Sequence, residues 1–275
     1  MYYRHDLDYV YPDKSDEHMI TAPHLRDVDL DEDYPYLQKG FWFQCKRVFM
    51  WVCLNLFMFL VVRIRHGLKI HGRENLKAHK NELKNGFITV SNHVLMWDFI
   101  CIMKALWPRL GYFPAWKTNL EGLNGPFIRM AGGIPIPTGR LACMRKFKDA
   151  MEAVLAGNKW VHFYPEGSMW FYYPDIRPLK KAVFQYAVKY DRPVLPLAFS
   201  FRPRNRFQRL FGRAPLVDLT VGVPIRHDAT LSRGTATAEL QERTYHILQG
   251  MVGIYPGDPT YLVNPDVATY QKTMG

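Results

Sequence analysis

The pattern of apolar and polar residues divides the chain into three parts. Residues 1–39 show no sustained period, residues 41–62 are almost entirely apolar, and from residue 68 onward short apolar runs alternate with segments of helical period. Strands separated by helices are typical of α/β domains. We therefore predict an α/β domain over residues 67–275, with a mixed, mostly parallel sheet flanked by helices. A helical segment (40–66) and an arm (1–39) precede it.

Individual elements follow from the same pattern. Predicted strands cover residues 86–91, 112–116, 134–136, 160–164, 194–199 and 217–223, and predicted helices cover 99–106, 141–156, 179–190 and 236–251. The helix over 141–156 has apolar residues at helical spacing and stops at Gly157, a common C-terminal signal. The strict alternation over 217–223 predicts an edge strand.

The apolar run at 41–62 predicts a helix associated with a membrane. From Val48 to Val62 it contains one strongly polar residue, Asn55. Fifteen helical residues span about 22 Å, short of the roughly 30 Å hydrocarbon core. Basic residues bracket the run: Arg47, Arg63 and Arg65. This favours a helix lying in one leaflet with its arginines on phosphates. A tilted span that includes residues 41–43 and a buried core helix are the alternatives.

Charge is distributed unevenly along the chain. Its net charge is +11, but residues 1–39 hold ten acidic and four basic residues, a net charge of −6, which leaves +17 for residues 40–275. The arm is predicted to be extended or partly disordered, with a solvated tail as the favoured interpretation. A basic body indicates a polyanionic partner. Because no nucleic-acid motif is present, we expect anionic membrane lipid and no nucleic acid.

Targeting and redox features indicate the compartment. None of the four cysteines forms a CxxC pair, which is typical of small core residues in a reducing compartment. The acidic, polar N-terminus differs from a secretory signal. Together with the apolar helix, these features predict a membrane-associated protein on the cytoplasmic face.

Candidate chemistry follows directly after the strand predicted at 86–91. The sequence there is Ser-Asn-His-Val-Leu-Met-Trp-Asp (91–98), and ligands of α/β sheets bind at such loops. His93 and Asp98 meet if the chain folds back between them. Asp98 then holds one imidazole nitrogen and leaves the other to take a proton, as in a hydrolase triad whose nucleophile is the substrate. Alternatively, His93 caps the next helix and Asp98 is a solvated acid of its first turn.

Further blocks make the pattern specific. Lys117, Leu120, Pro126 and the stretch 132–140 (GGIPIPTGR) follow, then a helix, then Pro-Glu-Gly-Ser at 165–168 and Val-Leu-Pro-Leu at 194–197. In this order, over residues 68–225, the blocks resemble those of the glycerolipid acyltransferase family, typified by 1-acyl-glycerol-3-phosphate O-acyltransferases.

The resemblance implies an O-acyltransferase that moves a fatty acyl group from acyl-CoA or acyl carrier protein to the hydroxyl of a lysophospholipid such as 1-acylglycerol-3-phosphate. His93 would be the general base and Asp98 its partner. No cofactor beyond the acyl carrier is expected. Residues predicted to bind substrate are Asn92, Lys117, Arg140, Glu166, Gly167 and Ser168. Lys117 and Arg140 are the candidates for holding an acceptor phosphate.

The chain departs from the family pattern at two places. Met169 stands where the family usually has an arginine after the Pro-Glu-Gly-Ser block, and Lys180-Lys181 precede Ala182 where a Lys-Gly pair is usual. One expected phosphate-binding cation is therefore missing, which leaves the acceptor headgroup open.

A second basic feature lies at 202–213. Arginines interleaved with apolar residues occur there: Arg202, Arg204, Arg206, Arg209 and Arg213. This loop suits anionic lipid with Phe207 and Phe211 inserted, the phosphates of coenzyme A, an acyl carrier protein, or plain solvation.

Two other functions compete with acyl transfer. A metal-dependent hydrolase would use ligands of suitable type at His93, Asp98, His162 and Glu166, although their spacing matches no recognised pattern. A non-catalytic membrane-binding protein would use only the basic body and the apolar helix.

Overall fold

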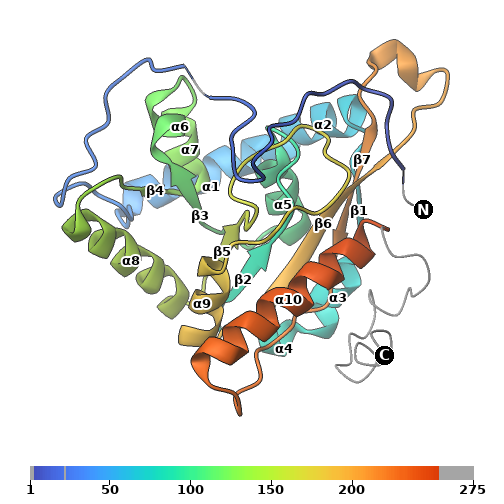
Figure 1. Ribbon diagram of the computed structural model, residues 1–275. Coiled ribbons are helices and arrows are strands. Elements are labelled where there is room, and N and C mark those ends of the chain that lie inside the picture. Colours follow the sequence, from blue (N-terminus) through green and yellow to red (C-terminus); the bar gives the residue numbers. More distant parts are fainter. Residues whose placement is uncertain (1–2, 22, 254–275) are drawn as a thin grey trace.

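A computed structural model describes residues 3–21 and 23–253 of the chain. Five strands form the main sheet in the order β1-β7-β6-β2-β5, with β6 and β7 antiparallel and the other pairs parallel. A second sheet pairs β3 with β4 in parallel. Helices cover both faces of the main sheet (Figure 1). The predicted α/β class with a mixed, mostly parallel sheet is confirmed.

Most predicted elements lie where the sequence pattern places them. The strands are β1 (Lys69–His71), β2 (Phe87–Val90), β3 (Phe113–Trp116), β4 (Gly133–Ile136), β5 (Trp160–Phe163), β6 (Val194–Arg202) and β7 (Leu216–Val221). The helices after residue 67 are α3 (Arg73–Ala78), α4 (Lys80–Leu83), α5 (Asp98–Leu106), α6 (Lys117–Glu121), α7 (Gly125–Ala131), α8 (Leu141–Ala156), α9 (Ala182–Lys189) and α10 (Arg233–Met251). A short 3₁₀ turn, η2 (Gln208–Phe211), lies within the arginine-rich loop.

The sheet separates two hydrophobic cores. Residues of β2 point alternately to each side, so that Ile88 and Val90 join the core under α8, α9 and α10, whereas Phe87 joins the core under α5. All four residues of β2 are buried, as expected of a central parallel strand covered on both faces. The loop that follows the carboxyl end of β2 is therefore held by a strand that is packed on both faces.

The position predicted for the strand at 217–223 is wrong. β7 lies inside the sheet, between β6 and β1, and β1 forms the edge. Lys69, Ile70 and His71 of β1 pair with residues 218–220, and a three-residue strand with two polar side chains leaves no recognisable pattern in the sequence. Because β1 was not predicted, the alternation in β7 indicated an edge strand, although β1 pairs with it in the sheet.

The apolar segment is helical over residues 41–65, as α1 (Phe41–Cys53), a π-helical turn η1 (Leu54–Met58) and α2 (Phe59–Arg65). Among the described residues, no helix has both the length and the apolar character needed to cross a bilayer. Arg47 does not face a membrane surface as predicted. It is buried, donates to the carbonyl oxygens of Gly111 and Ala131, and stacks on the Tyr112 ring.

The acidic arm lies against the body in the part that the structure describes. It has no helix or strand there, and it runs across the molecule from α2 toward α8 (Figure 1). The hydroxyl of Tyr11 donates to the Phe171 carbonyl, and the amides of Leu25 and Arg26 donate to the Glu121 carbonyl. These contacts differ from the solvated tail that the acidic composition favoured.

Candidate active site

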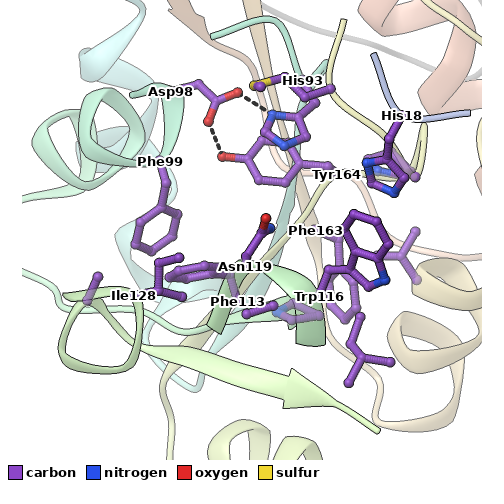
Figure 2. Close-up of a pocket in the computed structure, with 18 of the residues that line it drawn as sticks. His18, His93, Asp98, Phe99, Phe113, Trp116, Asn119, Ile128, Phe163 and Tyr164 are labelled. Atoms are coloured by element: carbon purple, nitrogen blue, oxygen red, sulfur yellow. Dashed lines mark hydrogen bonds and ion pairs between the residues drawn. The ribbon is translucent and has the colours of Figure 1, made fainter. Parts of the chain in front are cut away.

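The loop between β2 and α5 brings His93 and Asp98 together. Nδ1 of His93 lies 2.5 Å from Oδ2 of Asp98, which begins α5 (Figure 2). Asp98 is 2% exposed at its side chain, whereas His93 is 24% exposed. Because a carboxylate only accepts hydrogen bonds, Nδ1 carries the proton and Nε2 is left with a lone pair. The pair predicted from the sequence is therefore formed in the fold.

Tyr164 completes the pair from the end of β5. Its hydroxyl donates to Oδ1 of Asp98 over 2.6 Å, and its ring stacks on the His93 imidazole with centroids 3.7 Å apart. Burial, then the neighbouring Asp98 charge, raises the pKa of Tyr164 well above its usual value, so the phenol keeps its proton. Sequence reasoning missed this residue, although it directly precedes the Pro-Glu-Gly-Ser block.

A buried ion pair supports the catalytic loop from behind. Oε2 of Glu166 accepts from the backbone amide of His93 over 3.1 Å and from Nη2 of Arg177 over 2.7 Å. Arg177 also donates from Nη1 to Oγ of Ser168. Burial raises the pKa of Glu166, and the Arg177 charge opposes that shift. Glu166 and Ser168 thus position the loop and have no surface to offer a ligand.

Asn92 has a similar supporting position. It is fully buried, and its side chain exchanges two hydrogen bonds with the backbone of Phe199 in β6, at 2.9 and 2.8 Å. This clamp attaches the catalytic loop to the neighbouring strand. Asn92 therefore does not reach a substrate in this structure.

A cavity of about 880 Å³ opens beside the catalytic pair. This volume lies within the range of ligand pockets, roughly 300–1,000 Å³. Its lining is mainly apolar and aromatic, and His93, Phe99, Phe113 and Trp116 are among its walls (Figure 2). Gly167 also lines it, in a left-handed conformation at φ +88°. Such a chamber suits a long acyl chain next to a base.

The N-terminal arm contributes to this cavity, which the sequence did not indicate. The imidazole of His18 stacks on Trp116 with centroids 4.1 Å apart and lines the cavity (Figure 2). Burial, and then the nearby charge of His93, lower the pKa of His18. The start of the arm has a period of two residues, in which Tyr3, His5, Leu7 and Tyr9 are less exposed than their neighbours. An alternation of this kind is a signal that could have revealed packing of the arm.

Two predicted phosphate ligands lie outside the cavity wall. Lys117 begins α6 and pairs with Glu121 over 3.2 Å, and Arg140 is an exposed residue before α8. Neither is among the described residues that line the cavity, whereas Met169 and Lys180 are. The structure therefore brings Gly167 to the catalytic pair and leaves these two cations apart from it.

The four residues considered as metal ligands do not converge. Glu166 is bound by Arg177, and His162 is buried with Nδ1 2.9 Å from Oγ1 of Thr89. Within residues 3–21 and 23–253, no group of three or more His, Cys, Asp or Glu side chains has an arrangement that fits a metal ion. The metal-dependent hydrolase thus gains no support from the geometry.

His162 makes stability dependent on pH. Complete burial, then the His93 charge, hold its pKa well below the usual 6.5, so the folded protein keeps it neutral while the unfolded chain binds a proton. Stability is therefore present above pH 6.5 and falls below it, by up to about 1.4 kcal/mol per pH unit for this proton. Urea unfolding between pH 8 and 5 measures the slope. His162→Gln should reduce it, with exposed His24→Gln as the matched control, and an unchanged slope in the His162 variant would refute the assignment.

Comparisons with known proteins agree with this geometry. Residues 67–200 match the family model described as Acyltransferase. The structure is similar to the crystal structure of PlsC, the 1-acyl-sn-glycerophosphate (LPA) acyltransferase from Thermotoga maritima, with a TM-score of 0.54 and 20% sequence identity, covering 81% of this chain and 86% of that chain. A search of curated proteins finds no match to the chain. At 20% identity, the structural likeness establishes a shared fold.

These findings confirm the family and the enzyme class predicted from the sequence. The matched segment runs from before β1 into β6 and contains the catalytic loop, the Pro-Glu-Gly-Ser block and the walls of the cavity other than those from the N-terminal arm. Residues 67–200, just under half of the 275-residue chain, therefore match the acyltransferase family.

Proposed function

We propose that the protein transfers a fatty acyl group from a thioester, acyl-CoA or acyl carrier protein, to the hydroxyl of a lysophospholipid such as 1-acylglycerol-3-phosphate. The observation that carries this proposal is the His93–Asp98 pair, with the free imidazole nitrogen next to a large apolar cavity. A base beside an acyl-sized chamber fits transfer to an alcohol that the substrate provides.

The residues account for each proton in the transfer. Nε2 of His93 takes the proton of the acceptor hydroxyl as its oxygen attacks the thioester carbonyl. The tetrahedral intermediate then collapses, the carbon–sulfur bond breaks, and the imidazolium returns the proton to the leaving thiolate. Asp98 stabilises the imidazolium between these steps, and Tyr164 holds Asp98 in place. The products are the acylated lipid and the free thiol, and no cofactor is required.

Thiol release tests the proposal directly. Detergent-purified protein is mixed with palmitoyl-CoA and 1-acylglycerol-3-phosphate, and free thiol is measured with and without the acceptor. Acceptor-dependent release supports acyl transfer, and acyl carrier protein as donor distinguishes the two thioesters. If the folded protein binds lipid but releases no thiol with any donor or lysophospholipid, the non-catalytic alternative replaces the proposal.

The protein also has a surface suited to lipid, consistent with the proposed membrane location. Exposed apolar side chains form a stripe along α1, η1 and α2, and include Phe41, Trp42, Phe49, Leu56, Leu60 and Ile64. The opposite side of the helix is buried through Arg47, Trp51 and Val62. An amphipathic helix of this kind lies in the interface of a membrane. The cytoplasmic face remains a prediction.

The arginine-rich loop adjoins this stripe. Arg204 is buried and donates from Nη2 to the carbonyl oxygen of Arg65, at the end of α2. Arg202 binds Asp218 of β7. These two arginines therefore hold the loop, and the exposed Phe207 and Phe211, with the exposed arginines at 206, 209 and 213, form its free surface. We assign that surface to anionic lipid.

Removing apolar side chains from the stripe is expected to weaken membrane binding. A full burial of Phe or Leu is worth about 1.5–3 kcal/mol, so even partial insertion of two such residues makes Phe49→Ser/Leu56→Ser at least about tenfold weaker. Sedimentation with phosphatidylglycerol-containing vesicles measures it. Val10→Ser, at an exposed apolar residue of the arm, is the control. Equal binding of the double variant and the control would contradict the proposed surface.

A further inference from the structure

The N-terminal arm crosses the catalytic cavity between two regions that contact the body, residues 15–18 and residues 25–26, whose amides donate to the Glu121 carbonyl. Residues 15–18 are attached to the segment that follows the Pro-Glu-Gly-Ser block: the Ser15 carbonyl accepts from Arg177 over 2.6 Å, and the Glu17 carbonyl accepts from Nε1 of Trp170 over 2.9 Å. His18 then enters the cavity and stacks on Trp116 (Figure 2). Four described residues of the arm line the cavity: His18, Ile20, Thr21 and Pro23. The arm is thus a wall of the catalytic chamber.

Asp16 lies within this crossing and binds a cation of the cavity. Its Oδ2 accepts from Nζ of Lys180 over 3.2 Å. The hydrogen bond with Lys180, and then its charge, lower the pKa of Asp16, so the group is an anion near neutral pH. Lys180 lines the cavity just before α9. A carboxylate of the arm is therefore paired with a cation of the active-site cavity.

The ammonium group of Lys180 lies over Gly167. A Cβ at Gly167 would be 2.8 Å from Nζ and 2.7 Å from Cε of Lys180, so the absence of a side chain makes room for this cation. His18, His93 and Lys180 line the same cavity, and Asp16 contacts Lys180. The cation therefore shares a cavity with the catalytic base.

Other candidates for binding an anion at this end of the site are committed or uncharged. Arg177 is buried, and its guanidinium is used by Glu166, Ser168 and the Ser15 carbonyl. Met169 lines the cavity where an arginine was expected and carries no charge. Lys148 of α8 and Lys189 of α9 also line the cavity, and Lys189 donates to the Tyr190 hydroxyl. Among the described lysines of the cavity wall, Lys180 is the one that lies beside Gly167 of the Pro-Glu-Gly-Ser block.

We propose that Lys180 is the subsite for the phosphate monoester of the acceptor, and that Asp16 occupies this subsite in the unliganded enzyme and leaves when the acceptor binds. This inference rests on the proposed acyl transfer, because it names the headgroup that the same site accepts. It gives the acidic arm a function, and it places the missing phosphate-binding cation eleven residues after Met169.

The strength of the Asp16–Lys180 pair suits displacement. The two side chains are 55% and 54% exposed, and ion pairs in such positions are weak. A phosphate monoester carries about −1.5 to −2 charges near neutral pH and three acceptor oxygens, so it competes well with one carboxylate. A neutral headgroup gains nothing from Lys180 and leaves Asp16 in place. The arm thereby favours acceptors with an anionic headgroup.

Steady-state kinetics with matched variants test the subsite. Asp16→Asn should lower KM for 1-acylglycerol-3-phosphate about two- to fivefold, since the internal competitor is weakened. Lys180→Gln should raise this KM about tenfold or more, because a charge-assisted hydrogen bond is lost. Asp13→Asn and Lys181→Gln, at exposed neighbours of the same charge, should change neither value. KM for palmitoyl-CoA should stay constant throughout, whereas a change confined to that KM would assign Lys180 to coenzyme A and overturn the proposal.

Binding measured without turnover separates this proposal from the acyl-transfer reaction. Isothermal titration of glycerol 3-phosphate and of inorganic phosphate should show tighter binding to Asp16→Asn than to the original protein, and weaker binding to Lys180→Gln, with glycerol as the neutral control. This result stands even if thiol release fails. Phosphate binding that is identical in all variants would overturn the subsite while leaving the acyl-transfer proposal intact.

Discussion

An alanine in place of His93 is expected to reduce kcat by roughly 10²–10⁴-fold, the usual contribution of a general base. Nε2 of His93 is the one nitrogen of the pair that is free to take the hydroxyl proton, because Nδ1 is bound to Asp98. The rate of thiol release from palmitoyl-CoA in the presence of the acceptor measures the loss. KM for the acceptor should change little, since the imidazole acts in the chemical step.

A second variant separates loss of chemistry from loss of structure. His93→Ala leaves the buried Asp98 carboxylate with the Tyr164 hydroxyl as its remaining side-chain partner. In His93→Gln, the amide nitrogen can still donate to Asp98, but it accepts no proton at physiological pH. Both variants should be folded by circular dichroism and both inactive. A folded variant of either kind with full activity would remove His93 from the mechanism.

Much of the fold was predictable because local signals agreed with the tertiary structure. The helix over 141–156 has the bounds of α8, since its apolar period and Gly157 mark both the buried face and the end. β2 and β5 were found as apolar runs that become central parallel strands. β1 escaped detection because three residues carry too little pattern, and the role of β7 was misjudged as a result.

The catalytic pair was predictable for a different reason: both members lie within one short loop. His93 and Asp98 are five residues apart, so a strand-to-helix turn alone brings them together. The supporting residues come from distant parts of the chain. Arg177 lies eleven residues beyond Glu166, and His18 reaches the site from the arm, so only the folded arrangement shows that they belong to it. Lys117 and Arg140 were placed by block order and lie outside the cavity.

The largest effect on stability is expected for Arg177→Met. Arg177 is buried and donates to Glu166, whose own side chain is 1% exposed. Removing the guanidinium leaves a buried carboxylate with two backbone amides and no counter-charge, which typically costs about 3–5 kcal/mol. Urea unfolding at pH 7.5 measures it. Arg109→Met is the matched control, because Arg109 donates to the Leu83 carbonyl and its removal leaves no buried carboxylate without a counter-charge. Loss of this hydrogen bond should lower the free energy of unfolding by about 1.5 kcal/mol.

The double variant Glu166→Gln/Arg177→Met separates the charge from the packing. It removes both charges but keeps a glutamine oxygen for the His93 amide, so it should be more stable than Arg177→Met alone. In Arg177→Met, loss of the opposing positive charge raises the pKa of Glu166 further. Protonation at low pH then relieves the penalty, so the deficit relative to the original protein should be smaller at pH 5 than at pH 8. A deficit that matches Arg109→Met and does not change with pH would show that Arg177 contributes packing alone. In that case, the His93 amide is held without help from this ion pair.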